Sequence, residues 1–332
     1  MSGFSWQGRS VLVTGSTGFL GGWLTQALLD RGASVTALVR DEVPGTLFSR
    51  WKLAERCTVV RGSIEDQALV ERALNEYAVE AVFHLAAQAI VGVANRSPLS
   101  TFEANIRGTW TVLEACRRSP TVKRVVMASS DKAYGIAKKL PYTEDTPLAG
   151  RFPYDVSKSC ADLIAQSYAA TYGLPVSVTR CGNLYGGGDL NFNRIIPESI
   201  RALLKGEPPP IRSDGSPVRE YLYVEDAVSG YLALAEQMDR AEVVGRAFNI
   251  GTDKPQTVLE VVDALIRVSG RKGIKPRILN TAKHEIPEQS LDSTAAKKVL
   301  GWKPAYTLEE GLKKTFAWYQ DHFKTPAAFA RG

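Results

Sequence analysis

The segment "YDVSK", residues 154–158, carries a tyrosine and a lysine at a spacing that suits proton transfer. Tyr154 and Lys158 are four residues apart, so in a helix they share one face. A tyrosine ordinarily loses its proton at about pH 10, and a neighbouring ammonium group favours the phenolate form. A hydroxyl group from an earlier segment, Ser130 or Ser129, would orient a substrate alcohol. We therefore predict that Tyr154, Lys158 and Ser130 are catalytic residues of an enzyme.

A pair of opposite charges follows an apolar run. The segment "SSDKAYG", residues 129–135, comes after "VKRVVMA" and sets Asp131 beside Lys132. Two charges between a buried strand and the tyrosine-bearing helix are costly unless they are used. A base and an acid side by side can remove one proton and protonate a leaving group. The alternative is a solvated Asp–Lys pair at the start of a loop.

A glycine-rich segment, "VLVTGSTGFLGGWL", places Gly15, Gly18 and Gly21 between a β-branched run and a helical pattern. This spacing permits a tight turn, a close approach of the backbone to a pyrophosphate, and a helix N-terminus directed at it. It predicts a dinucleotide site, and glycines that only permit a tight turn are the alternative. The next run ends in "ALVRD". Asp41 would hold ribose hydroxyls and favour NAD, whereas Arg40 would meet a 2′-phosphate, so we expect NAD with NADP as the alternative.

These side chains need a scaffold that brings them together, and the first half of the chain predicts one. Short apolar runs alternate there with helical patterns. Apolar strands separated by helices predict a parallel sheet covered on both faces, which is an α/β, doubly wound, Rossmann-like fold. The predicted strands are residues 10–14, 34–39, 57–60, 81–86, 124–129 and 175–180. The predicted helices are residues 18–31, 66–77, 101–118 and 154–172.

The second half of the chain has a different pattern, in which loops rich in Gly, Pro and Asn separate the helices. Helices are predicted at residues 194–204, 225–238, 257–268 and 308–322. We predict a dinucleotide-binding domain in residues 1–181 and a smaller, mixed α/β substrate portion in residues 182–332. The boundary is soft, because segments from both sides can interleave.

The composition of the 332-residue chain, 44% hydrophobic and 23% charged, is that of an ordinary globular protein. Its net charge is +6, but the basic residues are scattered, whereas nucleic-acid binding needs a clustered stripe. The four cysteines form no CxxC motif or Cys/His cluster, which argues against a metal site and suits a reducing cytosol. No signal-length or membrane-spanning apolar run occurs. We expect a cytoplasmic protein without bound metal and without a nucleic-acid or membrane partner.

Six segments resemble the extended short-chain dehydrogenase/reductase family, also called the NAD-dependent epimerase/dehydratase family. They are "TGSTGFLG", "HLAAQ", "NIRGT", "SSDKAYG", "YDVSK" and "RCGNLYGGGD". In that family Tyr, Lys and Ser or Thr remove a hydride and a proton from a sugar carbinol. Sugar-nucleotide 4,6-dehydratases typically carry Asp-Glu where this chain has Asp131-Lys132, and epimerases carry small or neutral residues there. Asp-Lys resembles the subgroup that acts on CDP-glucose.

The resemblance implies a reaction on a nucleotide-diphosphate sugar. Oxidation at carbon 4 acidifies the proton on carbon 5, and water is then eliminated across carbons 5 and 6 with Lys132 as base and Asp131 as acid. The hydride returns to carbon 6 and gives a 4-keto-6-deoxy sugar. The alternatives are a nucleotide-sugar 4-epimerase of the same family, an ordinary reductase and a non-catalytic dinucleotide-sensing protein.

The resemblance also implies which residues bind ligands. The cofactor-binding residues are Gly15, Thr17, Gly18, Phe19, Leu20, Gly21, Arg40, Ser63, Ile64, Leu85, Ala86, Ala87, Gln88, Asn105, Tyr154 and Lys158. The substrate-binding residues are Gln88, Ser130, Asn183, Arg194 and Arg219, with Arg212 as a weaker candidate. Asn183 and Arg219 would contact the diphosphate and residues 194–200 the base.

Three further expectations concern single positions and assembly. Ser63 stands where the family often has an Asp that meets the adenine, so this contact is less secure. His84 is expected to pack in the core, and Asn105 to hydrogen-bond a neighbouring strand or to be solvated. By resemblance, helices 101–118 and 154–172 form a four-helix contact in a homodimer.

Overall fold

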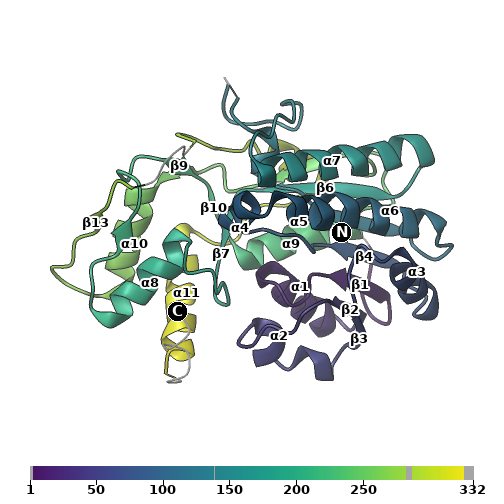
Figure 1. Ribbon diagram of the computed structural model, residues 1–332, viewed down its shortest axis with the longest axis horizontal. Coiled ribbons are helices and arrows are strands. Elements are labelled where there is room, and N and C mark those ends of the chain that lie inside the picture. Colours follow the sequence, from purple (N-terminus) through teal and green to yellow (C-terminus); the bar gives the residue numbers. More distant parts are fainter. Residues whose placement is uncertain (1–2, 138, 282–285, 325–332) are drawn as a thin grey trace.

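A seven-stranded sheet forms the centre of the larger part of the protein, on the right in Figure 1, and every neighbouring pair of its strands is parallel. The computed structural model describes residues 3–137, 139–281 and 286–324. From one edge to the other, the strands are β11 (Ala247–Ile250), β6 (Val176–Cys181), β5 (Arg124–Ala128), β4 (Ala81–His84), β1 (Ser10–Thr14), β2 (Ser34–Val39) and β3 (Thr58–Arg61). The strand order reverses between β1 and β4, and ligands bind at such a point in open α/β sheets. Six of these strands match the sequence prediction, and β11 was not predicted.

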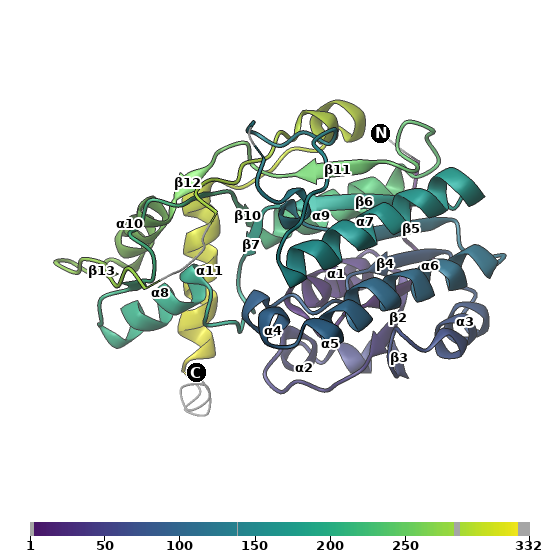
Figure 2. The same cartoon turned by 45° about the horizontal axis from the view of Figure 1, so that its top comes forward.

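Helices cover both faces of the sheet, so the predicted doubly wound, Rossmann-like fold is confirmed (Figures 1 and 2). On one face lie α1 (Phe19–Asp30) and α9 (Val224–Glu236). On the other lie α3 (Gln67–Glu76), α6 (Gly108–Arg118) and α7 (Pro153–Tyr172). Short helices lie near the edge at which the strands end: α2 (Leu47–Arg50), α4 (Val91–Arg96) and α5 (Pro98–Phe102). The predicted helix 101–118 is α5 and α6 joined by a π-helical turn, Glu103–Arg107.

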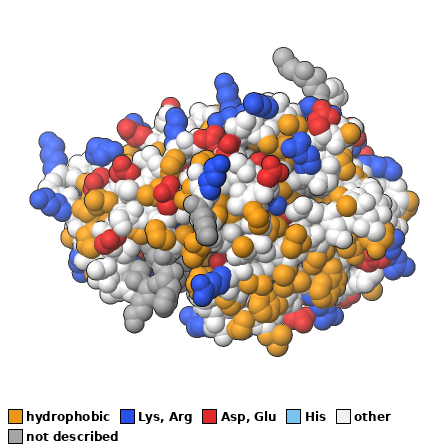
Figure 3. Space-filling view, turned by 90° about the horizontal axis from the view of Figure 1, so that it is seen from above, with side chains coloured by type: hydrophobic (Ala, Val, Ile, Leu, Met, Phe, Trp, Pro, Cys, Tyr) orange, Lys and Arg blue, Asp and Glu red, His pale blue; other side chains and the backbone are white. Residues whose placement is uncertain are grey.

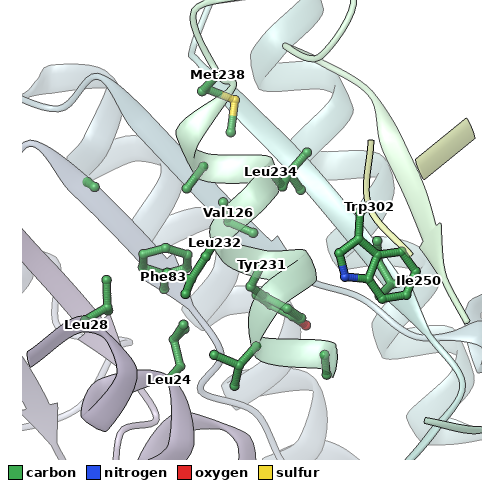
Figure 4. Packing of buried hydrophobic residues seen from close by; sticks show 14 of the residues in the cluster. Leu24, Leu28, Phe83, Val126, Tyr231, Leu232, Leu234, Met238, Ile250 and Trp302 are labelled. Atoms are coloured by element: carbon green, nitrogen blue, oxygen red, sulfur yellow. The ribbon is translucent and has the colours of Figure 1, made fainter. Parts of the chain in front are cut away.

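The core between the sheet and α1 and α9 is built from the apolar residues that made these segments predictable (Figure 4). One cluster contains Leu24 and Leu28 of α1, Phe83 and Val126 of the sheet, and Tyr231 of α9. None of these five residues is more than 1% exposed. Burying one aliphatic or phenyl side chain of this size contributes about 1.5–3 kcal/mol. This cluster fixes α9 on the sheet although α9 comes late in the chain.

The C-terminal portion lies beside the carboxyl ends of the strands and has its own apolar cluster (Figure 1). Its helices are α8 (Ile195–Lys205), α10 (Val258–Ser269) and α11 (Leu308–His322). Its short strands pair as β7 (Asn183–Tyr185) with β10 (Tyr221–Tyr223), β9 (Val218–Arg219) with β12 (Gln256–Thr257), and β8 (Pro210–Ile211) with β13 (Arg277–Ile278). Capping boxes at Thr257 and Thr307 begin α10 and α11.

The two predicted portions interleave around residue 181. Both α9 and β11 belong by sequence to residues 182–332, yet β11 adds a strand to the sheet of residues 1–181 and α9 covers one of its faces. Residues 325–332, the end of the predicted substrate portion, lie outside the described residues. None of the helices in the described part of the chain combines the length and apolarity that a membrane crossing requires.

Candidate active site

A cleft of about 1200 Å³ opens where the carboxyl ends of β1, β4, β5 and β6 meet the C-terminal portion. Its sheet-side wall is formed by the glycine turn, residues 85–88, residues 129–132 and residues 182–185, each of which follows one of these strands. The carboxyl ends of parallel strands lie at one edge, so the fold brings these distant segments together. Every site residue predicted by name except Asn105 lines this cleft, as do residues 194–198 of the predicted segment 194–200, while the roles of these residues stay predictions.

The glycine turn after β1 leaves room for a ligand close to its backbone. Gly15 has φ +78°, in the left-handed region that favours glycine. A Cβ atom on Gly21 would lie 1.9 Å from the Gly15 carbonyl oxygen, so this contact excludes any side chain. Gly18 caps α1 without a side-chain hydrogen bond, which leaves backbone amides of the first turn free for an anion. The buried Ser16 hydroxyl also has no partner among the described residues. The turn therefore fits the pyrophosphate of a dinucleotide.

The far end of the same wall carries the residues predicted to meet the adenosine. Arg40 and Asp41 line the cleft and pair with each other at 2.6 Å. Both are more than 60% exposed, so they remain free to rearrange around a ribose. Ser63 also lines the cleft, and its hydroxyl donates to the Glu65 carboxylate. The contact of Ser63 with the adenine stays a prediction.

Tyr154 and Lys158 lie on the first two turns of α7 and line the cleft beside Ser130. Lys158 Nζ donates to the Ala128 carbonyl oxygen at 2.8 Å, and burial lowers the pKa of Lys158 to about 8. Burial raises the pKa of Tyr154 to about 12, and a hydrogen bond with Ser130 and the charge of Arg194 oppose that rise. Without a bound ligand, burial therefore raises the pKa of Tyr154 by more than the expected lowering by the charge of Lys158.

Asp131 and Lys132 begin the 3-10 turn η3 (Asp131–Tyr134), which Ser130 caps by accepting from the Lys132 amide at 3.2 Å. Lys132 Nζ lies 3.3 Å from both carboxylate oxygens of Asp131, and the Ser130 hydroxyl donates to Asp131 Oδ1 at 3.1 Å. Asp131 is only 4% exposed. The alternative of a solvated Asp–Lys pair is therefore wrong, because the carboxylate is buried at the cleft.

Two groups beside Lys132 were not predicted from the sequence. Gln289 accepts a hydrogen bond from Lys132 Nζ, although it comes from a loop far along the chain. Asp155, on α7, is 4% exposed; burial raises its pKa, and the positive charge of Lys132 opposes the rise. For Asp155 the sequence offered one signal, a charged residue directly after the candidate tyrosine. For Gln289 it offered none.

Asn105 was predicted to bind the cofactor, and its position corrects this prediction. It is 1% exposed and does not line the cleft. Its side chain accepts from the Gln88 amide at 2.6 Å and donates to the Gln88 carbonyl oxygen at 3.1 Å and to Ser157 Oγ at 2.8 Å. It therefore ties the segment after β4 to the tyrosine-bearing helix from behind, and the solvated alternative is wrong.

His84 lies in the core, as predicted. Its ring contacts the hydroxyls of Thr14 (2.9 Å) and Thr109 (3.1 Å), and burial lowers its pKa to about 3. Among the described residues, no group of three or more His, Cys, Asp or Glu side chains could hold a metal ion.

The wall opposite the glycine turn carries three arginines and several amide and carboxylate groups. Arg194 caps α8 and donates to the buried Asp189 at 3.1 Å, and Arg212 donates to Glu198 at 2.8 Å. Arg219, on β9, donates to the Val218 carbonyl oxygen at 2.7 Å. The cleft is also lined there by Asp189, Asn193 and Glu198, of which Glu198 lies within the predicted range 194–200 and the other two were not predicted. This wall can bind a diphosphate through its guanidinium groups.

Comparison with known sequences gives consistent matches along the chain. The model of the NAD dependent epimerase/dehydratase family matches residues 11–251. The CDP-glucose 4,6-dehydratase of Salmonella typhimurium is 31% identical over 330 residues, covering 95% of this chain and 91% of that protein. The dTDP-glucose 4,6-dehydratase of Xanthomonas campestris pv. campestris is 33% identical over 333 residues, covering 93% and 92%.

Solved structures share the same architecture. The UDP-glucose 4-epimerase of Thermotoga maritima, solved with UDP-glucose, is similar with a TM-score of 0.87 and 31% identity, covering 95% of this chain and all of that one. The dTDP-glucose 4,6-dehydratase of Bacillus anthracis, solved with NAD, is similar with a TM-score of 0.84 and 30% identity, covering 94% and 97%. The chain therefore belongs to the NAD dependent epimerase/dehydratase family, whose cofactor is NAD.

Proposed function

We propose that this protein is a hydro-lyase, a nucleotide-sugar 4,6-dehydratase that converts CDP-glucose to CDP-4-keto-6-deoxyglucose. The observation that carries the proposal is the buried Asp131–Lys132 pair in the cleft, hydrogen-bonded to Ser130 beside Tyr154. A simple 4-epimerase or reductase has no use for this second acid–base pair, whereas elimination of water requires one. Two curated relatives named as 4,6-dehydratases support this choice.

The first step is the oxidation of carbon 4. NAD, when bound, supplies the hydride acceptor for carbon 4 and the hydride donor for carbon 6. Tyr154 takes the proton of the carbon 4 hydroxyl, and Ser130 orients that hydroxyl. Lys158, hydrogen-bonded to the Ala128 carbonyl oxygen, contributes a positive charge that favours the phenolate form of Tyr154.

The second step is the elimination. Lys132 takes the proton from carbon 5, the carbon 6–oxygen bond breaks, and Asp131 protonates the leaving hydroxide to give water. This requires a neutral amine and a protonated carboxyl, and a transfer of one proton across the 3.3 Å contact produces both without changing the net charge. Carbon 5 afterwards regains a proton from Lys132 as hydride returns to carbon 6.

The proton balance closes through Ser130. Its hydroxyl donates to Asp131 Oδ1 at 3.1 Å and hydrogen-bonds Tyr154, so it joins the two groups. The proton that Tyr154 takes from the carbon 4 hydroxyl can thereby replace the one that Asp131 gives to water. Overall the sugar loses one water and no net electrons.

The nucleotide would lie between the opposite wall and Asn183 of the sheet-side wall. We place the diphosphate at Asn183, Arg194 and Arg219, which offer an amide and two guanidinium groups to the cleft. The base would lie near Glu198 and Arg212. Preference for CDP-glucose over dTDP-glucose rests on the Asp-Lys pair, since relatives that act on either nucleotide are similarly distant.

A second candidate function is 4-epimerisation, which the match to the Thermotoga maritima epimerase favours. The deciding experiment incubates the purified protein separately with CDP-glucose, dTDP-glucose, UDP-glucose and GDP-mannose and measures product mass and free NADH. We expect CDP-glucose alone to lose the mass of one water without net NADH. An isomer of unchanged mass would establish the epimerase instead, and loss of water from another nucleotide sugar would correct the base.

We further propose that the protein is a homodimer joined through α6 and α7 of each copy. Large hydrophobic side chains are exposed on this side: Leu99 (72%), Trp110 (45%) and Leu163 (55%). Figure 3 shows hydrophobic side chains gathered on the right-hand part of the upper face, in the half of the molecule that holds the sheet. Light scattering after gel filtration should give a dimer for the protein and for L279E, a control in the C-terminal portion, and a monomer for L163E. A monomeric parent would refute the dimer.

We place the protein in the cytoplasm because all four cysteines are unpaired thiols. Fractionation of the cells that produce it should recover it with cytosolic markers. Recovery in an oxidising compartment would contradict this placement.

A further inference from the structure

The amine of Lys132 is held from two directions. On one side both carboxylate oxygens of Asp131 lie at 3.3 Å, and on the other Gln289 Oε1 accepts a hydrogen bond from Nζ. Gln289 is 1% exposed and does not line the cleft, so it reaches Lys132 from behind the wall. The side chain of Lys132 is itself only 19% exposed, so its surroundings restrict the positions that the amine can take.

The segment that carries Gln289 is fixed by its backbone. The Gln289 amide donates to the Val218 carbonyl oxygen at 3.0 Å, and the Ser290 carbonyl oxygen accepts from the Tyr142 amide at 2.8 Å. The next amide, of Leu291, donates to the buried Glu220 carboxylate at 2.8 Å. The amide oxygen that faces Lys132 is therefore held in place by three hydrogen bonds within three residues.

The chemistry of an amide suits this position. A lysine amine has only donors when charged, so it must face the Gln289 oxygen and not the nitrogen. When the amine is neutral, one N–H can still bond this oxygen, which leaves the lone pair to point elsewhere. A carboxylate in the same place would instead favour the charged ammonium form, because an opposite charge stabilises it. The amide of Gln289 can therefore orient the amine of Lys132 without adding a charge that favours its protonated form.

We propose that Gln289 is a positioning residue that directs the lone pair of Lys132 toward carbon 5 during the elimination step. This rests on the proposed function, because it assigns Lys132 as the base. Gln289 touches no substrate and acts only through Lys132. The charged groups that face this amine are Asp131, at 3.3 Å, and Asp155, whose titration the charge of Lys132 influences.

Two substitutions separate the direction of the amine from its charge. Q289M keeps the length of the side chain and removes the acceptor, whereas Q289E keeps the acceptor and adds a charge. The control is E288Q, since Glu288 is exposed on the same segment. For Q289M we expect the kcat for loss of water to fall by about threefold to tenfold with KM unchanged, as for one lost hydrogen bond between neutral groups. For Q289E we expect the acid limb of the pH–rate profile to move to higher pH, and E288Q should match the parent.

A double-mutant cycle with K132M tests whether Gln289 acts through Lys132. If it does, Q289M lowers kcat in the parent and causes no further loss in K132M. The same loss in both backgrounds would mean a merely structural role and would overturn the proposal, as would a Q289M enzyme with the kcat of the parent.

A measurement that needs no dehydratase activity distinguishes this proposal from the proposed function. The rate at which acetic anhydride acetylates Lys132, followed by mass spectrometry of the digested protein, should rise in Q289M and not in E288Q. Equal rates in Q289M and the parent would overturn the positioning role even if the parent converts none of the four nucleotide sugars. If the parent converts none of them and the rate still rises, the contact stands and the assigned reaction falls.

Discussion

Replacing Lys158 by methionine should abolish dehydration while stabilising the fold at neutral pH. Lys158 is 6% exposed, and burial lowers its pKa from 10.5 to about 8. A difference of this size corresponds to ~3 kcal/mol of unfavourable charge burial. Methionine removes that charge but also removes the donor to the Ala128 carbonyl oxygen, a loss of about 1–3 kcal/mol. At about pH 7 the variant should therefore be more stable by up to ~2 kcal/mol.

The sign of the pH dependence follows from the direction of the pKa shift. Below pH 8 Lys158 is charged in the folded and the unfolded state, so the parent carries the full burial penalty. Between pH 8 and 10.5 the folded protein loses this proton while the unfolded chain keeps it, and the parent gains stability. The advantage of K158M should thus shrink with rising pH and reverse once only the lost hydrogen bond remains.

Urea unfolding followed by circular dichroism at about pH 7 and about pH 9.5 measures this difference directly. K303M, at an exposed lysine, is the control and should give a difference from the parent that does not change with pH. A K158M difference that is equally large at both pH values would refute the reasoning, because it would show that the charge of Lys158 is not strained by burial. Retained dehydratase activity would remove Lys158 from the catalytic set.

Three further substitutions test Tyr154, the glycine turn and a buried ion pair. Y154F should lower kcat by about 10²–10⁴-fold, with binding of CDP-glucose by calorimetry little changed; a large loss of binding instead would make Tyr154 a binding residue. G21A should weaken NAD binding, measured by fluorescence titration, by at least about tenfold, because its Cβ would lie 1.9 Å from the Gly15 carbonyl oxygen; unchanged affinity would contradict the tight turn. D162N leaves the buried guanidinium of Arg180 without its carboxylate (2.8 Å) and should lower the free energy of unfolding by about 3–5 kcal/mol in urea; a loss below ~1 kcal/mol would refute this.

Most of the fold was predictable because its sheet is buried on both faces. Strands of this kind appear in the sequence as continuous apolar runs, and six of the seven were found from them. The missed strand, β11, is a run of only four residues, "AFNI", with Gly245 before it and Gly251 directly after it. Only its pairing with β6 makes it a strand, and that pairing is decided by tertiary packing rather than by local sequence.

The site was predictable to the extent that its residues stand in motifs. Tyr154 and Lys158 could be found because a fixed spacing on a helix carries their chemistry. Gln289 could not, because a glutamine has no distinctive chemistry until a fixed backbone aims its oxygen at a lysine 157 residues away. The pKa of Tyr154 was equally inaccessible, since burial, which raises it, depends on the completed cleft.

The late position of β11 in the chain has a consequence for synthesis. During translation β6 emerges with its outer edge unpaired, and that edge stays open until residue 250 has left the ribosome. The sheet face that α9 covers stays bare until residue 236. An open strand edge next to an apolar surface is prone to pairing with other chains. The nascent protein is therefore most exposed to aggregation while residues 182–250 are being made, and a chain terminated in this interval would need a chaperone to stay in solution.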